Sequence, residues 1–170
     1  MSCRALWVGA AGLAGLVVLA GCSGPPTTTR SSAGSDATSA PTGAAVASDP
    51  AAYAAELLLD TNAARVANNL PELARSTCAQ DAALQRAVAL VGAAELRHAS
   101  LTGVIAGCGP STTAAENLSR ASAAPSAVMD AWLKSPGHRS NLLDPALTEL
   151  GVGCVRDGVE MLCSQVYLGP

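Results

Sequence analysis

The stretch AVMDAWLKSPGHRSNLLDPALTELGVGC, residues 127–154, decides how the C-terminal half of the chain folds. Apolar residues one helical turn apart predict a helix over about residues 122–134. Ser135-Pro136 then joins a capping side chain to a proline at the first helical position, which predicts a short helix through Leu143. His138, one of two histidines in 170 residues, falls in this Ser-Pro-Gly segment.

The residues after this stretch change period, which indicates strands. LGVGCVRDGVEMLCSQVYLG, residues 150–169, contains a glycine turn and predicts a β-hairpin. Upstream, Ser48-Asp49-Pro50 begins one helix that ends before Pro71, and Ser76-Thr77 begins a second that reaches Arg97. Helices followed by a late antiparallel hairpin predict an α+β domain.

Each upstream helix has a side that is expected to face the core. On the first helix these residues are Tyr53, Leu57 and Thr61, and on the second they are Leu84, Val88 and Val91. The second helix is also expected to place His98 at or just after its C-terminal end.

Three segments carry a family resemblance. LLLDTNAARVANNLPEL, residues 57–73, contains N-x-x-R, and AENLS, residues 115–119, is expected to form a loop that carries Glu116. The third, W-x-x-S-P-G-H-R-x-N-L-L, lies within the opening stretch and is the most specific. Together they resemble the CAP superfamily, also called the SCP domain, and look like its bacterial branch over residues 54–169.

The resemblance implies a fold and a candidate site. The implied fold is a CAP-type three-layer α-β-α sandwich with a central antiparallel sheet. The family's cleft is lined by two histidines and two glutamates, and in some members it holds a divalent metal. His98, Glu116 and His138 match three of these four positions, whereas Ser135 stands at the second glutamate position. Imidazole and carboxylate ligands suit zinc or a similar metal, so these three residues are the predicted metal ligands.

Two functions from different classes follow. The favoured one is a binding module whose His/Glu cleft holds a divalent metal or a small or lipidic ligand. The alternative is a metal- or Ser/His-dependent hydrolase acting on a cell-envelope substrate, since Ser135, His138 and Glu116 are the residue types of a Ser-His-acid triad. Ser135 is, however, expected to cap a helix through the backbone of residues 137 or 138, and no G-x-S-x-G elbow is present.

The N-terminus predicts export and attachment to a membrane. Residues 1–21 have the charged start and apolar middle of a signal peptide. They end in Leu19-Ala20-Gly21-Cys22, which resembles the lipobox of bacterial lipoproteins and implies cleavage before Cys22 and its lipidation, palmitate included. Residues 22–50 are predicted to be this lipidated cysteine and a disordered Ser/Thr/Pro/Ala tether. Residues 51–170 are the predicted CAP/SCP domain, held outside the cytoplasm on the bacterial cell membrane.

Charge and composition argue against nucleic acid as a partner. The formal net charge is −3, so the chain has no overall basic field for phosphates. Aromatic residues make up only 2% of the sequence, too few to build stacking platforms for bases. The predicted partners are therefore the membrane, through Cys22, and a small-molecule or lipid ligand.

Four cysteines remain in the predicted domain, and an even number in an exported domain indicates disulfides. A two-residue turn at Gly158-Val159 sets Cys154 directly opposite Cys163, whereas a turn at Asp157-Gly158 makes them diagonal neighbours, too far apart to bridge. The first turn suits a glycine at its first position. The predicted pairs are Cys154 with Cys163 and Cys78 with Cys108.

Overall fold

The computed structural model describes residues 49–170. Their elements, in chain order, are α1 (Pro50–Ala67), β1 (Ala74–Arg75), α2 (Thr77–Ala89), α3 (Thr102–Gly107), β2 (Thr113–Ala121), α4 (Pro125–Lys134), α5 (Pro136–Leu142), β3 (Glu149–Asp157) and β4 (Glu160–Gly169). The predicted signal peptide, the lipidated Cys22 and nearly all of the predicted tether lie outside the described residues. No helix in the described part of the chain has the length and apolar content needed to cross a membrane.

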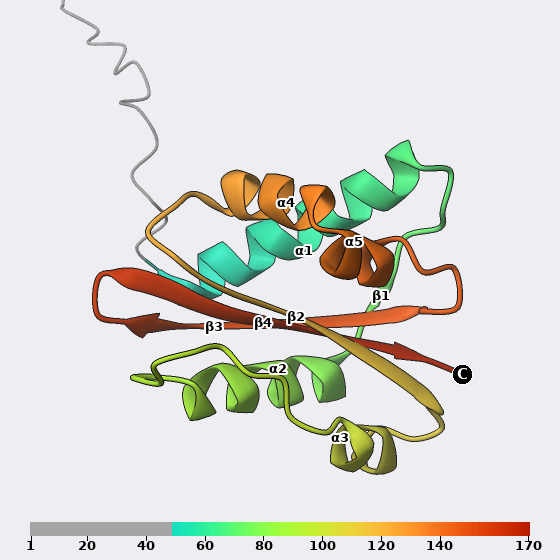
Figure 1. Cartoon of the computed structure of the whole chain (residues 1–170). Helices are drawn as coiled ribbons and strands as arrows, with labels where there is room; N and C mark the ends of the chain where they lie inside the picture. The colour runs from blue at the N-terminus through green and yellow to red at the C-terminus, as the bar shows by residue number, and fades with distance from the viewer. Residues whose placement is uncertain (1–48) are drawn as a thin grey trace, which may run out of the picture. The chain divides into compact units, whose positions relative to one another are not determined.

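The described chain forms three layers around one sheet (Figure 1). The strand order is β1-β3-β4-β2, with α1, α4 and α5 on one face and α2 and α3 on the other. β4 pairs antiparallel with both β2 and β3, while the short β1 pairs parallel with the start of β3. The predicted α+β, three-layer sandwich is confirmed, with β1 as a parallel addition to the antiparallel sheet.

Large side chains fill the layer between the sheet and α1, α4 and α5. Tyr53 and Leu57 of α1 are fully buried, as predicted, and Trp132 of α4 is 2% exposed. The Trp132 indole N–H donates to the carbonyl of Leu118 at 3.1 Å, which ties α4 to the outer edge of β2. This face therefore contains the main apolar core of the domain.

Arg65 is a buried charge inside this layer, and its side chain links α1 to two other segments of the chain. Its guanidinium donates to the backbone carbonyls of Pro71, Leu142, Asp144 and Leu147, at 2.9 to 3.2 Å. Hydrogen bonds of this kind satisfy a group whose burial would otherwise be costly. The N-x-x-R pattern of the first helix thus has a structural role, because its arginine joins α1 to the segments that precede β1 and β3.

The opposite face is packed through backbone contact. Ala79, Ala83 and Ala87 of α2 are fully buried against the sheet. A Cβ added to Gly151 or Gly153 of β3 would lie 2.0 or 2.3 Å from a backbone nitrogen of α2, so only glycine permits this approach. The helix therefore lies directly on the strand.

The prediction that Leu84, Val88 and Val91 face the core is wrong. They are 43%, 56% and 49% exposed. The physical reason is the approach just described, since a helix lying directly on a strand uses its alanine side and turns its larger apolar residues away. These residues do lie on a helix, but its buried side is the one that carries Ala79, Ala83 and Ala87.

Three further expectations about local structure need correction. α2 ends at Ala89 rather than reaching Arg97, so His98 lies in the following connection, well past the helix. Glu116 lies in β2 rather than in a loop, because the segment pairs along its whole length with β4. The short α3 was not predicted, and it begins without a side-chain cap that would have marked it.

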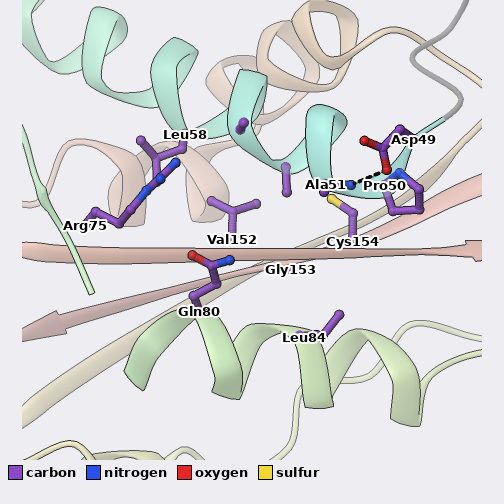
Figure 2. Close-up of a pocket in the computed structure, with 12 residues that line it drawn as sticks. Asp49, Pro50, Ala51, Leu58, Arg75, Gln80, Leu84, Val152, Gly153 and Cys154 are labelled. Atoms are coloured by element: carbon purple, nitrogen blue, oxygen red, sulfur yellow. Dashed lines mark hydrogen bonds between the residues drawn. The ribbon is translucent and has the colours of Figure 1, made fainter. Parts of the chain in front are cut away.

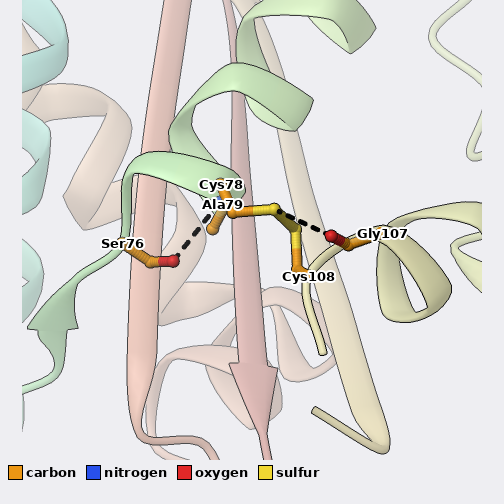
Figure 3. Close-up of a disulfide and its surroundings, with 5 residues drawn as sticks. All are labelled: Ser76, Cys78, Ala79, Gly107 and Cys108. Atoms are coloured by element: carbon orange, nitrogen blue, oxygen red, sulfur yellow. Dashed lines mark hydrogen bonds between the residues drawn. A yellow bond between two sulfur atoms is a disulfide. The ribbon is translucent and has the colours of Figure 1, made fainter. Parts of the chain in front are cut away.

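The disulfide and register predictions are confirmed. Asp157 pairs with Glu160 across a two-residue Gly158-Val159 turn, and Cys154 lies opposite Cys163 with Cα atoms 4.1 Å apart. The second bridge joins Cys78, in the first turn of α2, to Cys108 at the end of α3 (Figure 3).

Candidate functional site

Glu116 is the centre of a buried polar cluster on the α2 face of the sheet. Its carboxylate accepts hydrogen bonds from Arg86 Nε and from Arg86 Nη2 at 2.8 Å. It also accepts from His98 Nδ1 at 2.8 Å and from Ser164 Oγ at 3.0 Å. Burial alone would raise the pKa of Glu116, but the bonds from Arg86 and His98 outweigh burial and hold its pKa below the usual value. The carboxylate is therefore ionised and fully engaged.

Arg86 was not predicted as a site residue. It lies on the side of α2 that faces β2, and its hydrogen bond to Glu116 raises the pKa of its guanidinium. The side chains of Arg86 and Glu116 are 15% and 2% exposed, so the pair is shielded from water. Nothing in the local sequence marks Arg86, because the pairing depends on where the helix crosses the sheet.

His98 is the exposed end of this cluster, with 57% of its side chain accessible. Because an ionised carboxylate only accepts hydrogen bonds, Nδ1 carries the proton that joins His98 to Glu116. This fixes the neutral ring as the tautomer with an unprotonated Nε2. Among the described residues Nε2 has no hydrogen-bond partner, so it is left to accept a hydrogen bond from a ligand.

His138 lies in the first turn of α5 and approaches β2 from the opposite face of the sheet. Its backbone carbonyl accepts from Asn117 Nδ2 at 3.3 Å, and its ring centroid lies 6.3 Å from that of Trp132. Burial, and secondarily the charge of His98, lower the pKa of His138. The ring of His138 is therefore neutral at pH 7.

A buried network of neutral side chains fixes this edge of the sheet. Asn117 Nδ2 donates to Tyr167 Oη at 3.3 Å and accepts at Oδ1 from Asn141 at 3.0 Å. Gln165 Nε2 donates to Thr61 Oγ1 at 2.8 Å, and the Tyr167 hydroxyl donates to Gln165 Oε1. Burial raises the pKa of Tyr167, so its hydroxyl stays protonated as a donor. The network joins α1, α5, β2 and β4, and so holds His138 in place.

A cavity of about 400 Å³ lies beside His138, between β2 and α4. Val128 and Trp132 form apolar walls, while Ser135 and His138 contribute polar groups. The hydroxyl of Ser119, which also lines this cavity, is buried and has no hydrogen-bond partner among the described residues. An apolar hollow with a few polar groups is the usual form of a small-molecule site.

The expectation that the Ser135 hydroxyl caps α5 is wrong. Ser135 has the extended backbone of a cap, but its side chain makes no capping hydrogen bond. Pro136 supplies the fixed first residue of the helix, so α5 begins without the side-chain bond. The hydroxyl therefore belongs to the cavity. Among the described residues Glu116 bonds to His98 and not to His138, so the acid-histidine half of the predicted triad is not assembled.

The residues as placed do not fit a divalent metal. Within residues 49–170 no group of three or more His, Cys, Asp or Glu side chains is arranged to hold one. Both carboxylate oxygens of Glu116 already accept hydrogen bonds, and the cation beside them is the guanidinium of Arg86. A metal bound to His98, Glu116 and His138 would therefore have to displace Arg86.

Comparison with protein families and curated proteins gives two matches. The family model described as the cysteine-rich secretory protein family, CAP, matches residues 58–167. The uncharacterized protein YkwD of Bacillus subtilis (strain 168) is 40% identical over 57 residues, which are 34% of this chain and 21% of that protein. The match thus spans about a fifth of the length of this relative.

Three of the solved structures that are similar to the described domain come from bacteria. An extracellular protein containing an SCP domain from Bacillus anthracis str. Ames is 28% identical, with a TM-score of 0.62 over 71% of this chain and 41% of that one. A cysteine-rich secretory protein from Staphylococcus aureus subsp. aureus Mu50 is 22% identical, with a TM-score of 0.64 over 73% and 40%. An outer surface protein from Borrelia burgdorferi is 18% identical, with a TM-score of 0.63 over 71% and 95%. The last two matches show the fold alone.

Proposed function

The chain belongs to the cysteine-rich secretory protein (CAP) family, and from that premise we propose that it is an extracytoplasmic binding module. Its site is the cavity beside His138, and its ligand is a small or lipidic molecule. The observation that supports this proposal is the composition of the cavity, in which apolar walls from α4 surround Ser135 and the neutral His138. A ligand with an apolar body and one polar end would match this arrangement.

Support for a location outside the cytoplasm comes from two directions. Two disulfides, Cys78–Cys108 and Cys154–Cys163, suit an oxidising compartment. The similar Bacillus anthracis protein is described as extracellular, and the Borrelia burgdorferi protein as an outer surface protein.

The proposed anchor is the lipid on Cys22. Metabolic labelling with an alkyne analogue of palmitate should label the protein, and Cys22→Ala should abolish both the label and membrane retention.

A ligand-binding experiment tests the cavity. The full-length protein is titrated with palmitate while its amide and indole N–H signals are followed by NMR. We expect shifts at Trp132 and His138, and we expect Ala131→Trp, which fills the cavity, to abolish them. Leu59→Trp is the matched control, since Leu59 is exposed on α1 and should leave binding unchanged. Shifts that avoid the cavity, or that survive Ala131→Trp, would reject this site.

Hydrolysis is the second candidate, because Ser135 is free of its capping role and shares the cavity with His138. Ester, peptide and peptidoglycan substrates are incubated with the wild type and with His138→Ala. The missing bond between Glu116 and His138 leads us to expect no turnover above the variant's background. Turnover by the wild type that His138→Ala abolishes would replace the binding module with an enzyme.

A further inference from the structure

The opposite edge of the sheet from the His138 cavity is open. β1 pairs only with Glu149 and Leu150, the first two residues of β3. Beyond Leu150, no strand of the described chain covers the outer side of β3. Such an edge normally presents unpaired N–H and C=O groups to any extended chain that reaches it.

The register identifies which backbone groups are left unpaired at this edge, where Val152 and Cys154 are themselves only 3% and 5% exposed between the two helices. In an antiparallel pair, opposed residues about 4.5 Å apart at Cα do not share hydrogen bonds, and their backbone groups point away from each other. Cys154 and Cys163 are such a pair, with Cα atoms 4.1 Å apart. Cys154, and Val152 two residues before it, therefore direct their N–H and C=O groups outward. None of these four groups has a hydrogen-bond partner among the described residues.

The open edge is the floor of a groove with a volume of about 500 Å³. Figure 2 shows Val152 and Cys154 on β3 between α1, on one side, and α2, on the other. The α1 wall is formed largely of small residues, among them Ala51 and Ala54, and the α2 wall carries the exposed Leu84. Val88 follows Leu84 by one turn on the same side of α2. A ligand in the groove could therefore contact the apolar side chains that α2 turns away from the sheet.

We propose that this groove binds an extended peptide segment of a partner protein, which adds to the sheet as a strand along β3. The two helices rise on both sides of the edge, so a single strand can enter (Figure 2). A second copy of this domain would have to bring its own α1 and α2 to the same edge, because these helices flank β3 in each copy (Figure 2). Main-chain hydrogen bonds to Val152 and Cys154 provide affinity, and the helix walls select small or apolar side chains at alternate positions.

The charge of Arg75 sets the direction of the peptide. Arg75 lies at the end of the groove where β3 begins, and Asp49 lies at the other end, next to Cys154 (Figure 2). The Asp49 carboxylate is already engaged, since it caps α1 by accepting from the N–H groups of Ala51 and Ala52. The Arg75 side chain is exposed and has no hydrogen bond or ion pair within the described residues. A peptide antiparallel to β3 brings its carboxyl end to Arg75, which matches this charge, whereas a parallel peptide would bring its amino end there. The partner segment is thus extended, small or apolar in its middle, and acidic or C-terminal at the Arg75 end.

The test uses a phage library of random peptides, each about eight residues long to span the open edge at roughly 3.4 Å per residue. The library is selected on the full-length protein under oxidising conditions, and recovered peptides are synthesised. Amide hydrogen exchange then reports the site: bound peptide should slow exchange at Val152 and Cys154 and leave the His138 cavity unchanged. N-methylation of the peptide residues that face β3 should weaken binding at least tenfold, whereas N-methylation of the residues between them should not.

Arg75→Glu should weaken binding of peptides with a free carboxyl end about tenfold, and the exposed Arg97→Glu is the control expected to have no effect. Failure to recover a peptide, or recovery of peptides that leave Val152 and Cys154 unprotected, overturns the proposal. Protection that grows with protein concentration without peptide would assign the groove to a second copy instead. Protection that disappears when residues 23–48 are deleted would assign it to the chain itself. None of these outcomes depends on ligand binding beside His138.

Discussion

The two faces of the sheet are packed by different means. On the α1 face, Tyr53, Leu57 and Trp132 exclude water with large side chains. On the α2 face, alanines lie directly on Gly151 and Gly153, and a disulfide and the Arg86–Glu116 pair supply further links. The α1 face is stabilised by large apolar side chains, whereas the α2 face requires residues small enough for the helix to touch the strand. This difference teaches that the same sheet can be destabilised by opposite substitutions on its two faces.

Removing volume should cost most on the α1 face. Leu57→Ala deletes a fully buried side chain and should lower the free energy of unfolding by about 3 kcal/mol. Leu59→Ala, on the exposed side of the same helix, should change it by less than about 0.5 kcal/mol. Urea unfolding followed by circular dichroism measures both. Equal losses would mean that α1 does not pack as described.

The α2 face should depend instead on its covalent link. Replacing both Cys78 and Cys108 by alanine opens a loop with a sequence separation of 30 residues, and should cost about 3 kcal/mol. Amides of α2 and α3 should then exchange faster, while those of α1 and α4 keep most of their protection. Uniform loss of protection across both layers would show that the two faces unfold as one unit.

Adding volume should harm the α2 face at the glycines of β3. Gly153→Ala places a methyl group 2.3 Å from the Leu84 nitrogen, so α2 must move, and the expected cost is about 2 kcal/mol. Gly103→Ala, where a Cβ meets nothing within 4 Å, should be neutral or stabilising by about 0.5 kcal/mol. The matched pair makes the same chemical change, so the difference in urea midpoint isolates the contact. If Gly153→Ala leaves the urea midpoint unchanged, α2 does not lie directly on β3 and the two faces do not differ as described.

The same contrast decides how much the sequence could reveal. The α1 helix, the Gly158-Val159 turn and the Cys154–Cys163 bridge were predicted, because caps, glycine turns and hairpin register act over a few residues. The Cys78–Cys108 bridge, with a sequence separation of 30, followed as the remaining pair. The buried side of α2 was not, because it depends on glycines in β3 more than 60 residues away. Arg86 was missed for the same reason. The resemblance singled out Glu116, His98 and His138, but only the fold reveals that Arg86 and Ser164 surround Glu116.

Acid should destabilise the domain by less than the Leu57, Gly153 and cysteine substitutions above. Folding lowers the pKa of His138, mainly by burial, so its contribution is present above about pH 6.5 and is lost as the pH falls toward the folded pKa. Glu116 also has a lowered pKa in the folded state, and its contribution is lost lower still, as the pH falls through about 4.5. His138→Gln should flatten the fall in the urea midpoint just below pH 6.5 and leave the lower part intact. An unchanged profile in this variant would argue against a buried, neutral His138.

The smallest effect is expected from added metal, which would join the two faces, since His98 reaches β2 from the α2 side and His138 from the α5 side. In the wild type the Arg86 guanidinium already neutralises Glu116, and a divalent cation at the same carboxylate would meet a like charge. Cobalt(II) or zinc at ten times the protein concentration should therefore change neither the melting temperature nor the visible spectrum. Arg86→Met keeps the length of the side chain but removes the charge. Glu116, which already bonds to His98, is then free to bind a metal, and a cobalt absorption should develop that His98→Ala abolishes. Cobalt absorption in the wild type, lost in His98→Ala, would show that Arg86 yields its place and that the metal-binding prediction made from the sequence is correct.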